Sequence, residues 1–239
     1  MPGGTRFSGA IMREHASGFT AVIPDFKRVS PKHGELFRSR DPAQIARLLV
    51  ERGARALSVV TESEHFGGSA ELLAQIVKSV DVPVLRKDFI TDEAALEDTA
   101  RLGAAAVLLI VAIIGASALP GLHEKALALG LEPLVEARAP EEMAAAAAVG
   151  ARLVGINNRD ITRLEKDGGS AERTAALAHL APSGAVLISE SGIAAPQDAR
   201  AASRAGAHAV LVGTALWLSE DMAKTYESLR VPLAPNTVP

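Results

Sequence analysis

The chain contains no cysteine among its 239 residues, which excludes disulfide bonds and thiolate metal sites and fits a reducing compartment. It has no excess of positive charge, because its net charge is −3 and its isoelectric point is near 6.1. This balance gives no general attraction to nucleic acid or to anionic membranes. The most apolar run, residues 104–114, is much shorter than the ~20 residues of a membrane span. No apolar stretch near the N-terminus resembles a secretion signal. We therefore expect a soluble, cytoplasmic protein.

Several functional motifs are also absent from the sequence. The six histidines show no metal-ligand spacing, and His208, within an apolar run, fits a core or strand-entry position better than a ligand position. There is no P-loop, no dinucleotide-binding fingerprint and no nucleophile elbow. We expect neither a metal nor a cofactor from these patterns.

A repeated pattern organises what is present. Gly-Ala followed by a short apolar run occurs at Gly53, Gly103, Gly150 and Gly206. Each glycine follows a helix-like stretch, at residues 42–52, 93–102, 140–149 and 196–205, where glycine favours the left-handed turn that ends a helix. The chain thus repeats a helix, a glycine and a buried strand.

The apolar runs predict eight strands separated by mostly helical segments. Short, almost continuous apolar runs are typical of strands that are buried on both faces. The expected strands are residues 21–27, 56–60, 82–88, 106–110, 131–136, 153–156, 185–190 and 209–212. This alternation could form a doubly wound open sheet, but the count of eight favours a single-domain α/β fold, the (β/α)8 TIM barrel. We expect a short N-terminal segment (1–20), the barrel (21–218), and a C-terminal helix and tail (219–239).

In a barrel of this type the chemistry takes place at the carboxyl ends of the strands. Asp25 and Lys27 share one face of the first strand, while Lys87 and Glu136 occupy matching positions on the third and fifth. Each charge alone could be solvated at a loop entrance. Together on inward faces they predict a site in which a protonated lysine acts as general acid and a carboxylate as general base.

The loops after the seventh and eighth strands carry a different signal. Ser191 and Gly192 follow the seventh strand, and Gly213 and Thr214 follow the eighth. Glycine lets backbone N–H groups approach an anion, and barrels often bind phosphate at these two loops. Ser30, after the first strand, could add a hydroxyl. We expect a phosphorylated small-molecule substrate.

Six motifs together resemble the indole-3-glycerol phosphate synthase family of tryptophan biosynthesis, over about residues 7–218. They are Lys27 to Pro31 (KRVSP), Pro83 to Ile90 (PVLRKDFI), Pro133 to Glu136 (PLVE), Gly155 to Asp160 (GINNRD), Ile188 to Ile193 (ISESGI) and Val212 to Thr214 (VGT). The resemblance implies a barrel of the ribulose-phosphate-binding type. It also implies a cofactor-free lyase that converts 1-(2-carboxyphenylamino)-1-deoxyribulose 5-phosphate to indole-3-glycerol phosphate, with loss of CO2 and water.

The resemblance also implies roles for individual residues. Lys87 would be the general acid at the ketone, Glu136 would transfer protons, and Lys27, paired with Asp25, would hold the substrate carboxylate and assist loss of hydroxide. The remaining assignments are Asn157, Arg159, Glu190 and Ser191 for orienting the substrate, Phe89 for packing on its aromatic ring, and Ser30, Gly192, Gly213 and Thr214 for the phosphate.

Three features depart from the family pattern. The acid on the first strand is usually Glu, and here it is Asp25. Pro24 lies in an expected central strand, where its missing N–H predicts a local bulge. Only about twenty residues precede the first strand, fewer than the family's usual N-terminal extension. A diverged barrel for a related aryl-amino sugar phosphate, or a non-catalytic binder of phosphate ligands, is therefore an alternative. We expect a monomer, although an oligomer stays possible.

Overall fold

The computed structural model describes residues 6–159 and 171–233, and within them eight parallel strands close into a barrel. The strand order around the barrel is β1–β10–β9–β8–β7–β6–β5–β4. The strands are β1 (Ala21–Phe26), β4 (Leu57–Val60), β5 (Val84–Lys87), β6 (Ala106–Ile110), β7 (Glu132–Ala137), β8 (Leu153–Asn157), β9 (Val186–Glu190) and β10 (Ala209–Val212). A small antiparallel hairpin, β2 (Val29–Ser30) and β3 (Gly34–Glu35), follows β1. The predicted (β/α)8 barrel is confirmed, and the open sheet is excluded.

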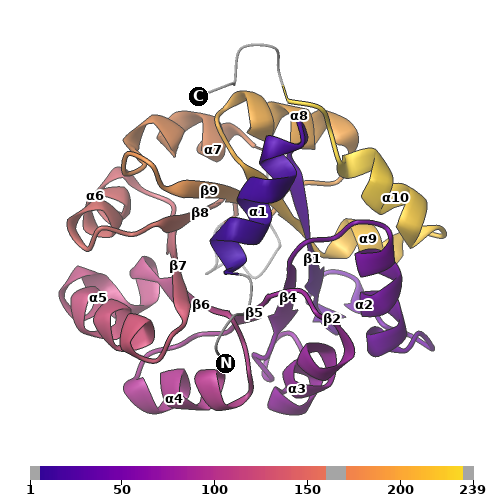
Figure 1. Cartoon of the computed structure of the whole chain (residues 1–239), viewed down its shortest axis with the longest axis horizontal. Helices are drawn as coiled ribbons and strands as arrows, with labels where there is room; N and C mark the ends of the chain where they lie inside the picture. The colour runs from indigo at the N-terminus through magenta and orange to yellow at the C-terminus, as the bar shows by residue number, and fades with distance from the viewer. Residues whose placement is uncertain (1–5, 160–170, 234–239) are drawn as a thin grey trace.

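Helices surround the barrel as an outer ring (Figure 1). They are α2 (Pro42–Glu51), α3 (Ala70–Ser79), α4 (Glu93–Arg101), α5 (Val111–Ala128), α6 (Pro140–Ala148), α7 (Glu172–Leu177), the 3-10 turn η2 (Ala178–Leu180), α8 (Pro196–Arg204), α9 (Thr214–Leu218) and α10 (Met222–Leu229). Helix α5 is kinked at Gly115, which has φ 75° and ψ 154°. The C-terminal helix expected within residues 219–239 corresponds to α10.

Local sequence signals explain where several helices begin and end. Asp41, Ser69, Asp92 and Asp221 each cap a helix by accepting a backbone N–H from its first turn. The four glycines of the Gly-Ala pattern all have positive φ, between 66° and 105°. Their left-handed conformation ends the preceding helix and directs the chain into the next strand, as the pattern predicts.

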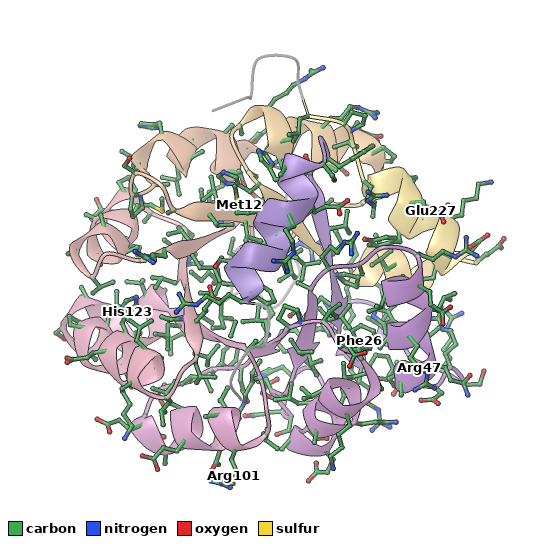
Figure 2. All side chains as sticks on the ribbon, viewed as in Figure 1. Met12, Phe26, Arg47, Arg101, His123 and Glu227 are labelled. Carbon is green, nitrogen blue, oxygen red and sulfur yellow. The ribbon has the colours of Figure 1, made fainter. Side chains whose placement is uncertain are left out.

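Side-chain parity divides the apolar residues between the barrel interior and the layer beneath the helices. On β1, Ile23 belongs to the interior cluster, whereas Val22 and Phe26 pack outward against helices. Figure 2 shows charged side chains such as Arg101 and Glu227 extending from the outer helices into solvent. Since Asp25 follows Ile23 at a spacing of two, its side chain points into the barrel.

The bulge predicted at Pro24 is wrong. Strand β1 pairs residue for residue with β10 from Ala21 to Pro24, and with β4 at Asp25 and Phe26. The pairing with β4 begins only after Pro24, so the missing N–H of this proline interrupts no ladder.

Helix α1 (Phe7–Ala16) closes the barrel at the amino ends of the strands. It lies across the centre of the ring in Figure 1, and Phe7, Ala10 and Ile11 join the interior cluster. The backbone N–H of Ser8 donates to the Glu132 carboxylate at the start of β7. At the same end, His208 accepts the Leu187 N–H through Nδ1 at 3.0 Å, which confirms a strand-entry role. In the part of the chain that the structure describes, every helix is too short or too polar to cross a bilayer.

Candidate active site

A cavity of about 420 Å³ opens among the loops at the carboxyl ends of the strands. Most of the predicted site residues line it: Asp25, Lys27, Lys87, Phe89, Asn157, Arg159, Ser191, Gly192, Gly213 and Thr214. Glu136, Glu190 and Ser30 are buried outside the cavity lining. The cavity therefore gathers residues from β1, β5 and β8 and from the loops after β9 and β10.

Asp25 is held firmly at the end of β1. The Ser58 hydroxyl on β4 donates a 2.7 Å hydrogen bond to Asp25 Oδ1, and both residues are buried. Two residues further on, the Lys27 ammonium lies 5.6 Å from the centroid of the Phe66 ring, a cation–π distance. The Asp25 carboxylate and the Lys27 ammonium therefore each have a specific neighbour, Ser58 and Phe66.

The Glu62 carboxylate organises the loop after β4. It accepts the backbone N–H groups of Glu64, His65 and Phe66 at 2.9–3.0 Å. These bonds hold Phe66 beside Lys27. Glu62, Glu64 and His65 bring potential metal-ligand atoms within 4.8 Å of one another, but the backbone hydrogen bonds already account for the position of Glu62.

A polar network behind β5 fixes the segment that carries Lys87. The Arg86 guanidinium donates to the hydroxyls of Thr61 and Thr99 and to the Asp88 carboxylate, each at 3.0 Å. Asp88 in turn accepts the Phe89 N–H at 2.8 Å. Because Arg86 and Lys87 point to opposite faces of the strand, the network anchors β5 from one face, and Lys87 lines the cavity on the other.

Glu136 and Glu190 are two buried carboxyl groups at the ends of β7 and β9. Among the described residues, none of their four oxygens has a partner in hydrogen-bonding geometry, although Asn157 is close enough to Glu136, and Glu136 to Glu190, to affect the pKa of each carboxyl group. Gly155 on β8 makes room for them: it is in register with Glu136, and a Cβ on it would lie 2.0 Å from Glu190 Oε1. The absence of a side chain at residue 155 therefore permits this pair.

Burial raises the pKa of both glutamates. For Glu190, burial and then the charge of Glu136 raise the pKa to about 8, against a partial lowering by Lys87. For Glu136, burial raises the pKa and the Lys87 charge opposes the rise. Near neutral pH the pair therefore holds at least one proton, so it can donate as well as accept one.

Asn158 connects the ends of β8 and β9. Its side-chain amide donates at 3.0 Å to the Ser189 hydroxyl and to the carbonyls of Glu190 and Ser191. Its oxygen accepts the backbone N–H and the hydroxyl of Thr174. The neighbouring Asn157 lines the cavity and accepts the Arg159 N–H at 3.0 Å. Asp160, which ends the GINNRD motif, lies outside the described residues.

The loops predicted to bind phosphate follow β9 and β10, and their assignment to phosphate stays a prediction. Ser191 has φ 65° and Gly192 has φ 73°, so the chain turns sharply after β9. A Cβ on Gly213 would lie 3.3 Å from Asp25 Oδ2, which makes glycine the best fit beside β1. Ser30 is buried outside the cavity lining, whereas His33, in the turn between β2 and β3, lines the cavity.

Several supporting residues of the site were not predicted from the sequence. A glycine inside a strand often marks a close approach of another group, so Gly155 was detectable. Ser58 and Asn158 gave no comparable signal, because their roles depend on which strands become neighbours. His33 and Asp198 also line the cavity, and Asp198 accepts the backbone N–H groups of Ala194 and Ala195 at 2.9 Å.

Comparison with known proteins agrees with this geometry. Residues 4–229 match the model of the family described as indole-3-glycerol phosphate synthase. The protein of that name from Carboxydothermus hydrogenoformans is 40% identical over 220 residues, which cover 92% of this chain and 83% of the relative. Those from Pyrococcus furiosus and Deinococcus radiodurans are 43% and 44% identical, over 85% and 87% of this chain and 88% and 77% of the relatives. The chain belongs to the indole-3-glycerol phosphate synthase family.

Proposed function

We propose that this protein catalyses the ring closure of 1-(2-carboxyphenylamino)-1-deoxyribulose 5-phosphate to indole-3-glycerol phosphate. The observation that carries the proposal is one cavity, in a member of this family, lined by Lys27, Lys87 and Arg159 and by the two proposed phosphate loops. The substrate has a carboxylate at one end and a phosphate at the other, so a site with cations and backbone-lined loops suits both. The volume, about 420 Å³, is within the range of small-molecule sites.

In the first step, the ring carbon that bears the carboxylate attacks the ketone carbon. The Lys87 ammonium gives its proton to the ketone oxygen, which becomes a hydroxyl group. The bond to the carboxylate then breaks, CO2 leaves, and the bonding electrons restore the aromatic ring. Lys27, paired with Asp25, holds the carboxylate until it leaves.

In the second step, the new hydroxyl group leaves as water. The nitrogen lone pair expels it while Lys27 supplies the proton, and a proton is then removed from the neighbouring carbon to complete the indole. We assign that removal to Glu136. The Lys87 charge lowers the pKa of both Glu136 and Glu190, so these three groups are electrostatically coupled.

The other predicted residues bind and orient the substrate. We assign Asn157, Arg159, Glu190 and Ser191 to the anthranilate and ribulose portions, and Phe89 to the aromatic ring. Phosphate binding is assigned to Ser30, Gly192, Gly213 and Thr214. The proposed reaction requires no cofactor.

Turnover can be measured directly with the purified full-length chain. Incubation with the carboxyphenylamino-deoxyribulose phosphate should produce indole fluorescence and release one equivalent of CO2. Tight binding without product would indicate a phosphate-ligand binder instead. Turnover only with a differently substituted aryl ring would indicate altered specificity. Either result would overturn the proposed substrate.

We further propose that the protein acts as a monomer in the cytoplasm. The large exposed apolar side chains in the described residues are Met12, Ile113, Leu127, Leu180 and Leu218, and they are scattered over the four helical elements α1, α5, η2 and α9. This scatter argues against a shared apolar interface. Light scattering at micromolar concentration should give the mass of a single chain, and a dimer mass would contradict the first part of this proposal.

A further inference from the structure

Trp217 is the single tryptophan of the chain, and it lies buried on α9, in the helix that begins at Thr214. Its indole Nε1 donates a 2.9 Å hydrogen bond to the backbone oxygen of Asp25. Asp25 is the last inward-facing residue of β1 before Lys27. The bond therefore connects α9 to the strand end that carries two of the proposed catalytic groups.

The indole N–H replaces a backbone donor that the β1–β10 ladder lacks at Asp25. Strands β1 and β10 pair in register as far as Pro24 and Val212. If this register continued, the next donor to the Asp25 oxygen would be the backbone N–H of residue 214. The chain instead turns at Gly213, with φ −111° and ψ −80°, and enters α9. Trp217 restores from its side chain the hydrogen bond that the turn removes.

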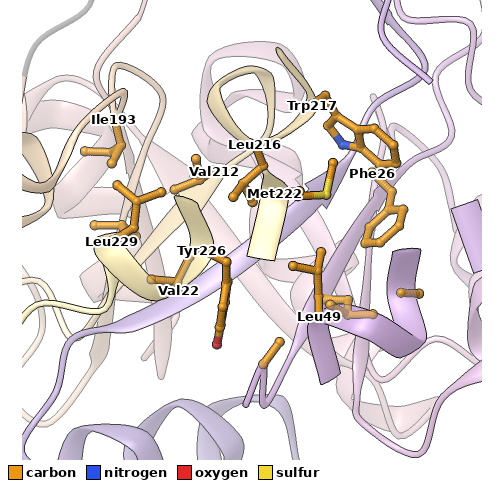
Figure 3. Close-up of a cluster of buried hydrophobic side chains, with 14 of the residues drawn as sticks. Val22, Phe26, Leu49, Ile193, Val212, Leu216, Trp217, Met222, Tyr226 and Leu229 are labelled. Atoms are coloured by element: carbon orange, nitrogen blue, oxygen red, sulfur yellow. The ribbon is translucent and has the colours of Figure 1, made fainter. Parts of the chain in front are cut away.

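Trp217 is itself held in one orientation. Its ring packs edge-on against Phe26 with centroids 5.4 Å apart, and lies 4.4 Å from the Phe37 ring. The Arg40 guanidinium lies 5.1 Å from its ring and donates to the Trp217 backbone oxygen. Figure 3 shows Trp217 beside Phe26 at the edge of the apolar cluster. A donor fixed in this way can define the position of its acceptor.

The backbone and the side chain of Asp25 are therefore held by different elements. Trp217 holds its backbone oxygen, Ser58 holds Oδ1 at 2.7 Å, and the Gly213 backbone closes the side next to Oδ2. We propose that Trp217 is a positioning residue that sets where the Asp25 carboxylate meets Lys27 and the substrate. This inference rests on the proposed function, because it concerns a residue of the same site.

A single tryptophan allows a precise chemical test. Growth of a tryptophan auxotroph on 3-benzothienylalanine replaces the indole N–H of Trp217 with sulfur and nearly preserves the ring shape. We expect kcat/KM to fall about tenfold, as for other residues that orient a functional group. In an Asp25→Ala background the same replacement should reduce kcat/KM by less than threefold, because its effect passes through Asp25. An equal loss in both backgrounds, or no loss in either, would overturn the proposal.

A matched control separates positioning from packing. Leu229→Ala removes a fully buried side chain at the other end of the same apolar cluster, so it should lower the melting temperature but leave kcat/KM within twofold. A tenfold loss for this variant as well would show that general loosening of the cluster is enough.

A readout without substrate keeps the inference separate from the proposed function. In ¹⁵N-labelled wild-type protein the single indole N–H signal should exchange with solvent at least 100-fold more slowly than that of free indole, because the group is buried and bonded. Rapid exchange would show that the indole N–H is not held in this hydrogen bond, and it would overturn the positioning role. Absence of wild-type turnover, with a protected indole N–H, would overturn only the proposed function.

Discussion

Buried carboxylates at the two ends of the barrel are treated in opposite ways. At the closed end, Glu14 of α1 is 4% exposed, and its Oε1 accepts from the Arg230 guanidinium at 2.6 Å. The Arg55 Nε lies 3.7 Å from the other oxygen. At the open end, Glu136 and Glu190 are each 1% exposed, and none of their oxygens meets an arginine or lysine in hydrogen-bonding geometry among the described residues.

This difference indicates that the buried carboxylate at the closed end contributes to stability, whereas those at the open end contribute to the chemistry. A buried charge is tolerated when an opposite charge compensates it, and it is costly otherwise. Glu14 at the closed end follows that rule, whereas Glu136 and Glu190 at the open end are buried beside each other, with the Lys87 charge opposing the rise of their pKa. Unsatisfied polar groups of this kind are expected at functional sites. Removing the cation near the buried carboxylates should therefore affect stability at the closed end and turnover at the open end.

The largest effect is expected from Lys87→Ala. This change removes the proposed general acid and the positive charge that lowers the pKa of Glu136 and Glu190. We expect kcat to fall by about 10²–10⁴-fold, the usual contribution of general acid–base groups, with little change in melting temperature. Lys125→Ala is the matched control, since Lys125 pairs with exposed Glu93 and Glu97 on α4. A Lys87 variant with more than a tenth of wild-type kcat would exclude this residue as the acid.

At the closed end, Arg230→Ala should affect stability rather than turnover. It leaves Glu14 buried with only the more distant Arg55, so the free energy of unfolding should fall by about 3 kcal/mol, the low end for a broken buried pair. Urea denaturation measures this loss, and kcat at a temperature where the variant is folded should equal that of the wild type. Arg52→Ala, which breaks an exposed pair with Glu227, should cost about 0–1 kcal/mol. Equal losses for both variants would contradict the comparison.

The raised pKa of Glu190 predicts a pH dependence of stability. With a pKa of about 8 in the folded protein, against 4.5 ordinarily, the folded chain keeps a proton that the unfolded chain loses between these pH values. The contribution of this group to the free energy of unfolding therefore decreases by about 1.4 kcal/mol per pH unit as the pH rises from 4.5 to 8. Glu190→Gln cannot titrate and should lack this decrease in urea melts at pH 5, 6.5 and 8. Parallel curves for the two proteins would show that the Glu190 pKa is ordinary.

Gly155→Ala tests the space that the two carboxyl groups share. The new Cβ would lie 2.0 Å from Glu190 Oε1, so the Glu190 side chain must move. We expect kcat to fall about 10²-fold, the scale for a misplacement of about 1 Å. Gly121→Ala in α5 is the control, because no atom outside the helix lies within 4 Å of that Cβ, and kcat should not change. Wild-type kcat in the Gly155 variant would mean that the position of Glu190 is unimportant.

Most of the fold was predictable because its signals are local. The Gly-Ala pattern marked four helix ends, and apolar runs placed the eight barrel strands to within a few residues. The β2–β3 hairpin was missed, since its strands have two residues each and carry no periodicity. The bulge at Pro24 was wrong because the propensity of a residue was considered without the register of its neighbours.

Site residues were predictable where strand parity alone decides that a side chain faces the barrel interior. Lys27 and Lys87 face one cavity because inward faces converge in any barrel. Ser58 on β4 and Trp217 on α9 were missed for the opposite reason, since each acts on Asp25, which belongs to another element. The Trp217 bond joins residues 192 positions apart, and no periodicity within one element indicates such a contact.

The smallest effect, and the sharpest test of how tightly the open end is built, is expected from Asp25→Glu. The extra methylene adds about 1.5 Å of reach, yet Ser58 and the Gly213 backbone already enclose the shorter carboxylate. The longer side chain must leave the Ser58 hydroxyl and shift toward Lys27, so we expect kcat/KM to fall about tenfold. Adding Ser58→Gly makes room on the β4 side and should recover part of the loss. A large gain in the single variant would instead show that Asp25 falls short of the substrate. In that case the fit around Asp25 would be, like the pairing of Glu14 at the closed end, a feature of stability rather than of catalysis.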